Sequence, residues 1–171
     1  KRAAPEVSLG TLILAAQLAD LAWPMFVMLG WESFRISPGF TAVTPLEFLH
    51  YPYSHSLLAL ALWGAAPGAA FYALRRRAWA AVIVAAVVLS HWLLDAASHA
   101  PDMPLTIGGT KRVGLGLWNS VAATLAVEGV LFAVGLALYV RATRAIDRVG
   151  WWSLTAFVAF LLVLYVAAVF G

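Results

Sequence analysis

The chain has no cysteine and very few charged residues, and each shortage excludes whole classes of protein. Without cysteine there can be no disulfide, no thiolate metal ligand and no cysteine nucleophile. Only 11% of the 171 residues are charged and 63% are hydrophobic, whereas soluble domains average about 25% charged and about 45–50% apolar residues. This composition excludes an ordinary cytosolic domain, a disordered tail and a nucleic-acid-binding module. It predicts an integral membrane protein.

Five apolar runs are long enough to cross a bilayer, which takes about 20 residues of helix. The runs are rich in Ala, Leu and Val, and none alternates with the period of two expected for a membrane β-barrel. The first run is longer than the apolar core of a signal peptide and contains Gln17 and Asp20, so we interpret it as a retained helix. We therefore expect an all-α polytopic protein, a single membrane domain over residues 1–171 and a bundle of five transmembrane helices. The predicted spans are about 7–29, 56–74, 78–97, 117–140 and 151–170.

The positions of the cations predict the orientation of these spans. Eight Lys and Arg residues fall on one side of the predicted topology and three on the other. An excess of Lys and Arg marks the cytoplasmic side. The N-terminus is therefore expected to be cytoplasmic and the C-terminus external, with the long connections at residues 30–55 and 98–116 outside. The cytoplasmic set is Lys1, Arg2, Arg75, Arg76, Arg77, Arg141, Arg144 and Arg148, and the external set is Arg35, Lys111 and Arg112.

Ionisable residues inside the predicted spans indicate where the chemistry lies. Asp20, Asp95 and Glu128 lie within spans, where an ionisable group costs several kcal/mol and usually marks a functional or paired site. All four histidines fall on the predicted external side. A rise of 1.5 Å per residue gives the depth of each group along its helix. By this measure, groups from several helices lie in one outward-facing region. We expect a polar cavity that is open to the outside.

A histidine and carboxylate pattern in the third span predicts a metal site. His91, Asp95 and His99 are spaced i, i+4, i+8, which keeps their side chains on one helix face. Imidazole and carboxylate one turn apart can bind Zn²⁺ or a similar divalent ion. His50 and His55 could add ligands from the start of the neighbouring helix. A cysteine-free donor set suits Zn, Mn, Fe or Ni, and we favour Zn.

Each candidate ligand also has a simpler interpretation. His91 and Asp95 could form an intramembrane hydrogen-bonded pair, and His99 could be a solvated residue near the interface. His50, which precedes Pro52, could only shape its loop.

Asp20 and Glu128 are the candidate catalytic residues. An ionisable and partly desolvated carboxylate can act as a general base or orient a metal-bound histidine. Asp20 could instead hydrogen-bond to Gln17 or to a neighbouring helix. Glu128 could pair with Asp20, one of them protonated, or with water.

Two of these motifs resemble a known family. The segment from His50 to Leu57, His-Tyr-Pro-Tyr-Ser-His-Ser-Leu, is followed about 35 residues later by His91-x-x-x-Asp95. The pair is similar to the signature of a bacterial inner-membrane family described as metal-dependent hydrolases, or as LexA-binding membrane proteins. Members carry a histidine followed by Arg-Gly, then Thr-His-Ser-Leu at the start of a helix, and His-Leu-Leu-Leu-Asp in a later helix. His50, His55, His91 and Asp95 fall on the matching positions.

The resemblance covers about residues 50–100, and the chain departs from the family pattern at several points. Ser54 stands where the family has Thr, and Tyr51-Pro52 replaces Arg-Gly. The stretch 98–102 also differs, and the first span has Gln17 or Asp20 in place of an expected histidine. The resemblance implies a multi-pass protein of the inner (plasma) membrane and a metal-dependent hydrolase.

Three functions fit these residues. The first is a membrane-embedded metal-dependent hydrolase whose substrate is a lipid or lipid-linked ester, because the site lies at membrane level on the external side. The second is a proton or metal relay, or an accessory subunit of a transporter, that uses the buried carboxylates and histidines. The third is a scaffold in a larger membrane complex or homo-oligomer. Membrane lipids are expected partners in every case, and nucleic acids are not.

The predicted orientation can be tested with single cysteines, because the chain has none of its own. A cysteine placed near Arg76 or Arg144 should be protected from a membrane-impermeant thiol reagent in intact cells, and one near Gly108 should be labelled. The reverse labelling pattern would contradict the orientation and the external site.

Overall fold

The structure is a computed structural model that describes residues 5–170, and most of it is helical. Helices contain 67% of the chain, with a few short strands. The expectation of a mainly helical protein is confirmed, and the two small sheets are features that the sequence did not predict. The chain divides into two compact units, residues 1–37 with 46–117 and residues 38–45 with 118–171. The single membrane domain stays a prediction.

The first unit begins with a broken helix. The helices α1 (Leu9–Ala16) and α2 (Leu18–Met28) are bent by 46° relative to each other at Gln17. The Ser8 side chain accepts a hydrogen bond from the Thr11 amide and so caps the start of α1. Pro24 lies inside α2 and has no N–H to donate to the preceding turn. The break matters because the region around it contributes to the site described below.

Two long helices, α4 (Leu57–Arg75) and α5 (Ala78–Ser98), form the hairpin on which the first unit is built. Arg76 joins them with a positive φ of 53°, a left-handed conformation that ends α4 sharply. Close packing depends on two glycines of α4. A Cβ on Gly64 would lie 2.8 Å from the Ala85 carbonyl oxygen, and one on Gly68 would lie 3.0 Å from that of Ala81. Small residues of this kind allow helices to approach closely in membranes.

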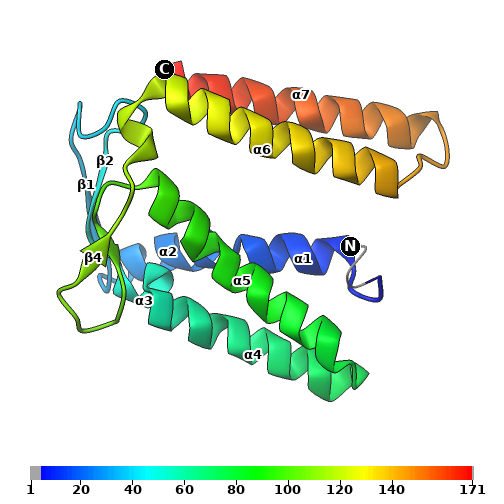
Figure 1. The fold of residues 1–171 in the computed structure, drawn as a ribbon, viewed down its shortest axis with the longest axis horizontal. Coiled ribbons are helices and arrows are strands. Elements are labelled where there is room, and N and C mark those ends of the chain that lie inside the picture. Colours follow the sequence, from blue (N-terminus) through cyan, green and yellow to red (C-terminus); the bar gives the residue numbers. More distant parts are fainter. Residues whose placement is uncertain (1–4, 171) are drawn as a thin grey trace. The chain divides into compact units, whose positions relative to one another are not determined.

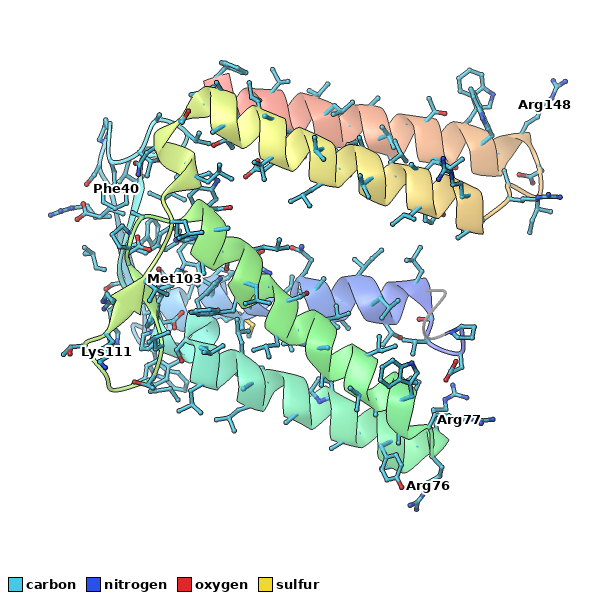
Figure 2. The ribbon with its side chains drawn as sticks, in the orientation of Figure 1. Phe40, Arg76, Arg77, Met103, Lys111 and Arg148 are labelled. Carbon is cyan, nitrogen blue, oxygen red and sulfur yellow. The ribbon has the colours of Figure 1, made fainter. Side chains whose placement is uncertain are left out.

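Short elements cover one end of this hairpin (Figure 1). The antiparallel strands β1 (Ser33–Ile36) and β2 (Leu46–His50) lead into a single helical turn, α3 (Pro52–His55). The strands β3 (Met103–Pro104) and β4 (Arg112–Val113) form the second sheet. Within this unit, Lys111 lies at the opposite end from Arg76 and Arg77 (Figure 2).

The second unit is a helical hairpin of α6 (Val121–Ala142) and α7 (Arg148–Phe170), preceded by the short 3-10 helix η1 (Leu117–Asn119). The two helices run antiparallel, side by side (Figure 1). Ser120 caps α6 by accepting a hydrogen bond from the Ala123 amide, as expected for serine at this position.

Within residues 5–170, four helices are long and apolar enough to cross a membrane: α4, α5, α6 and α7. The bent pair α1 and α2 would be a fifth span if the two helices are counted together. The predicted spans agree with the long helices to within four residues at each end, the largest difference being the start of α6.

The close contact of α4 and α5 predicts opposite effects for one substitution at two glycines. Ala is better than Gly in a helix by about 1 kcal/mol, but at Gly64 the new methyl group would press on the Ala85 carbonyl. We expect Gly64→Ala to lower the melting temperature in detergent, because overpacking costs about 1–3 kcal/mol. Gly135→Ala in α6 is the control, because its Cβ would meet nothing within 4 Å among the described residues. Equal melting temperatures for the two variants would contradict the prediction.

Candidate metal centre

Four side chains from three elements of the first unit point their polar atoms at one place. They are Asp20 of α2, His55 of α3, and His91 and Asp95 of α5. His55 Nε2 lies 3.4 Å from Asp20 Oδ1 and 3.7 Å from Asp95 Oδ2. His91 Nε2 lies 3.5 Å and 3.0 Å from the same two oxygens. The two imidazole rings have their centroids 5.4 Å apart.

These separations fit a shared cation. The donor atoms of Asp20, His55 and His91 all lie within 4.8 Å of one another, so these three residues could hold a metal ion. A tetrahedral ion with bonds of about 2.0–2.1 Å has its ligands about 3.3–3.4 Å apart. The four histidine-to-carboxylate separations fall on both sides of that value. The predicted ligand Asp95 lies outside this group of three, but its Oδ2 is 3.7 Å from His55 Nε2 and 3.0 Å from His91 Nε2.

The break in the first helix pair fixes the tautomer of His91. Its Nδ1 lies 2.9 Å from the Ala16 carbonyl oxygen, at the end of α1. A carbonyl only accepts hydrogen bonds, so Nδ1 must carry the proton. Nε2, the atom that faces the two carboxylates, is then the nitrogen that can offer a lone pair to a metal.

A second chain of hydrogen bonds fixes His55 in the same way. The Ser54 hydroxyl lies 2.6 Å from Glu32 Oε2 and 2.7 Å from His55 Nδ1. A carboxylate accepts, so the hydroxyl donates to Glu32 and must accept from the Nδ1–H of His55. The Nε2 lone pair of His55 is thereby directed at the cluster. Both histidines thus have the tautomer of a metal ligand.

Glu32 is a further residue of the centre that was not predicted from the sequence. Its side chain is almost fully buried, and Oε1 accepts hydrogen bonds from the backbone amides of Tyr53 and Ser54, each at 2.8 Å. It therefore satisfies free N–H groups at the start of α3 and orients His55 through Ser54. A lone glutamate in a long connection has no spacing relation to the histidines. The one available signal in the sequence was that this glutamate lies in the same connection as other polar residues.

The order of these three residues excludes a serine nucleophile of the usual kind. In a catalytic triad the histidine lies between the serine and the acid. Here the serine lies between the acid and the histidine, and its proton is committed to Glu32. Ser54 positions His55.

Two polar atoms of the centre lack the hydrogen bonds that buried groups normally have. His91 Nε2 and Asp95 Oδ2 are buried and have no hydrogen-bond partner in the described part of the chain. An unsatisfied buried polar group is costly, and a cation between these atoms would remove the penalty for both. Exposure differs sharply within the group: the side chains of His55, His91 and Asp95 are 6%, 11% and 18% exposed, and that of Asp20 is 52% exposed. Within the first unit, the centre is therefore open on the side of Asp20.

His99 does not join the three residues that could hold a metal ion. The helix α5 ends at Ser98, and His99 has an extended backbone (φ −66°, ψ 153°). It therefore leaves the helix face that carries His91 and Asp95, and the expected i+8 relation is lost. Its Nδ1 lies 3.2 Å from Asp102 Oδ1.

The same aspartate accepts a hydrogen bond from the hydroxyl of Tyr51, which is fully buried, at 2.8 Å. Burial raises the pKa of this phenol, and the charge of Asp102 raises it further. Tyr51 therefore acts as a hydrogen-bond donor at neutral pH. The role of this cluster is to tie the end of β2 to the loop after α5.

His50 and Glu128 also lie outside the three-residue group. His50 is an exposed residue at the end of β2, and its ring packs edge-on against Tyr53. Glu128 belongs to the second unit, where it accepts a hydrogen bond from Trp118 Nε1 at 3.1 Å. It also lines a pocket of about 310 Å³ between α6 and α7.

No family model, curated protein or solved structure matches this chain. The functional proposal therefore depends on the geometry of the centre.

The hydrogen bonds to Glu32 predict that this residue affects metal affinity without being a ligand, because it orients His55 through Ser54. Glu32→Gln keeps the shape of the side chain but replaces one acceptor with an amide NH₂, so Ser54 and His55 lose their fixed orientation. Loss of such an outer partner lowers metal affinity about 10–100-fold, measurable by titrating the metal-free protein with zinc and a competing chelator.

Glu47→Gln is the matched control. Glu47 is paired with Arg35 at 2.6 Å on the small sheet, and hydrogen bonds from Ser37 and Arg35 lower the pKa of its carboxyl. Its substitution should leave the zinc affinity unchanged. Equal affinities for the wild type and both variants would show that Glu32 does not orient the ligand.

Proposed function

We propose that this chain is a membrane-embedded, metal-dependent hydrolase with five transmembrane spans, of which α1 and α2 together form the first. The metal centre consists of His55, His91 and Asp95, with Asp20 at its solvent-exposed side. The N-terminus is cytoplasmic, so that the centre lies at the external end of the bundle.

The observation that carries this proposal is the convergence of two oriented histidines and two carboxylates. The acceptors on the far side of each imidazole direct both Nε2 atoms inward. Carboxylates that face these nitrogens complete a set of nitrogen and oxygen donors at metal-ligand spacing. A pair of His91 and Asp95, 3.0 Å apart, accounts for part of this arrangement, but it does not account for His55 and Asp20 converging on the same place.

Zinc is the ion that this donor set suits best. Two imidazole nitrogens and one carboxylate oxygen form a frequent catalytic zinc site that keeps a fourth position for water. A divalent ion held by these residues would supply Lewis acidity and would lower the pKa of a bound water to about 7.

The residues of the chain divide the remaining work. His55, His91 and Asp95 are well buried and act as ligands. Asp20, which is half exposed, lies on the side of the site from which the substrate enters. It accepts a proton from water as a general base. Glu32 and Ser54 are positioning residues for His55, and the Ala16 carbonyl plays this role for His91.

The membrane part of the proposal is supported by the apolar surface of the long helices. Large hydrophobic side chains along α6 and α7 are widely exposed, including Leu131, Phe157 and Val163. Such a surface is normal when the surrounding solvent is lipid. The resemblance to bacterial inner-membrane hydrolases favours that membrane, and the centre contains three of the four residues that carry the resemblance: His55, His91 and Asp95.

A metal or proton relay without hydrolysis is the second candidate. The same buried histidines and carboxylates favour it, because ionisable groups inside membrane proteins also form proton and ion pathways. Hydrolytic activity separates the two.

The division of roles predicts different effects for the two aspartates. Asp95→Asn should remove most of the zinc that copurifies with the protein, because it changes a buried ligand. Asp20→Asn should retain zinc but lower the rate of hydrolysis about 10²–10⁴-fold, the usual contribution of a general base. Elemental analysis and a panel of 4-nitrophenyl carboxylate and phosphate esters measure the two properties.

His50→Ala serves as the control and should alter neither property, because His50 lies exposed on β2. Zinc loss in Asp20→Asn together with retention in Asp95→Asn would reverse the assignment. Zinc binding with no hydrolysis of any ester would favour the relay.

A further inference from the structure

An aromatic pocket in the first unit shares the short helix α3 with the candidate metal centre. It has a volume of about 470 Å³ and is lined by residues of α2, α3 and α4 and of the loop between β3 and β4. Four aromatic side chains form much of its wall: Phe26, Trp31, Tyr53 and Trp63. Ala66 and Ile107 are among the aliphatic residues of the lining. The volume lies in the range of small-molecule sites, about 300–1,000 Å³.

The aromatic walls support one another. The ring of Phe26 stacks on that of Trp31 with centroids 5.5 Å apart, and it lies 6.3 Å from that of Trp63. Tyr53 packs edge-on against both Phe26 and Trp31. Ring pairs at these distances stabilise one another, so the pocket is formed before any ligand enters.

The pocket presents almost no polar group to a ligand. Trp63 Nε1 donates a hydrogen bond to the Tyr53 carbonyl oxygen at 2.9 Å, and the Tyr53 amide donates to Glu32. No charged side chain is among the described residues that line it. An apolar, aromatic lining of this kind favours a hydrocarbon chain, which it would hold by van der Waals packing.

The wall of the pocket and the metal centre share one short helix. Tyr53 lines the pocket, and His55, two residues later on α3, faces the metal centre. Two residues of helix rise only about 3 Å, but their side chains project to opposite faces, so the pocket and the centre lie on two sides of the same helical turn. Glu32 binds the Tyr53 amide and the Ser54 hydroxyl, and so fixes the position of one site relative to the other.

We propose that this pocket holds the hydrocarbon chain of an amphiphilic substrate whose ester group lies at the metal centre. The inference rests on the proposed function and specifies its substrate class. The substrate is a lipid ester with a long hydrocarbon chain, in preference to a small soluble ester. The pocket gives specificity for the chain, and the centre acts on the polar end.

A photoreactive fatty acid tests this directly. Dodecanoic acid with a diazirine on its chain is added to the purified protein in detergent, irradiated, and its adducts are mapped by mass spectrometry. Adducts should concentrate on the pocket segments of α2, α3 and α4, and unlabelled dodecanoate should compete. Ala66→Phe, which fills the pocket, should reduce labelling about tenfold. Ala61→Phe is the matched control, an exposed alanine of the same helix outside the pocket.

Two further measurements separate this inference from the proposed function. His91→Ala should lose metal yet keep saturable labelling of the pocket. Ala66→Phe should raise the KM for 4-nitrophenyl dodecanoate about tenfold with no change for the acetate ester or for metal content. Labelling spread along all lipid-facing helices, or equal labelling of both phenylalanine variants, would overturn the chain site. Saturable pocket labelling without any ester hydrolysis would support the chain site and overturn the hydrolase.

Discussion

A polar group buried among apolar helices needs a partner, and this constraint explains how the candidate centre is built. Unsatisfied backbone or side-chain groups cost several kcal/mol where water is absent. The bend at Gln17 lies next to the Ala16 carbonyl, which is used to bind His91 Nδ1. The same break places Asp20 on the first turn of α2, at the height of His55 and His91. The break between α1 and α2 therefore supplies the Ala16 carbonyl that accepts a hydrogen bond from His91, and the Asp20 carboxylate that faces both imidazoles.

The connection between α2 and α4 meets the same requirement at the other histidine. α3 is a single turn, too short to be stable as an isolated helix. Glu32 compensates for this by accepting its free amide groups and the Ser54 hydroxyl. The carboxylate is buried, but three donors satisfy it. One residue thus holds α3 in place, orients His55 and sets the position of Tyr53 in the aromatic pocket.

Hydropathy and charge predicted the helices well, because the length of an apolar run is a strong and local signal. The helical spacing of His91 and Asp95 also predicted a pair that does lie together. The same spacing failed at His99, since the helix ends one residue earlier and the periodicity no longer applies. Asp20 was identified as a buried carboxylate, yet its place at ligand distance depends on the bend at Gln17, which hydropathy does not show. Glu32 could not be predicted, because its role comes from tertiary contacts with residues about twenty positions later, beyond β1 and β2.

The uneven exposure of the four donors argues for a reactive site over a purely structural one. Structural zinc sites are closed, with four protein ligands and no position for water. Here three donors are well buried, and the fourth, Asp20, has half of its side chain exposed. A carboxylate at the solvent boundary can exchange its place with water, whereas the buried donors cannot move without leaving polar groups unpaired. The buried His55, His91 and Asp95 therefore form the rigid part of the centre, and Asp20 lies on its exposed side.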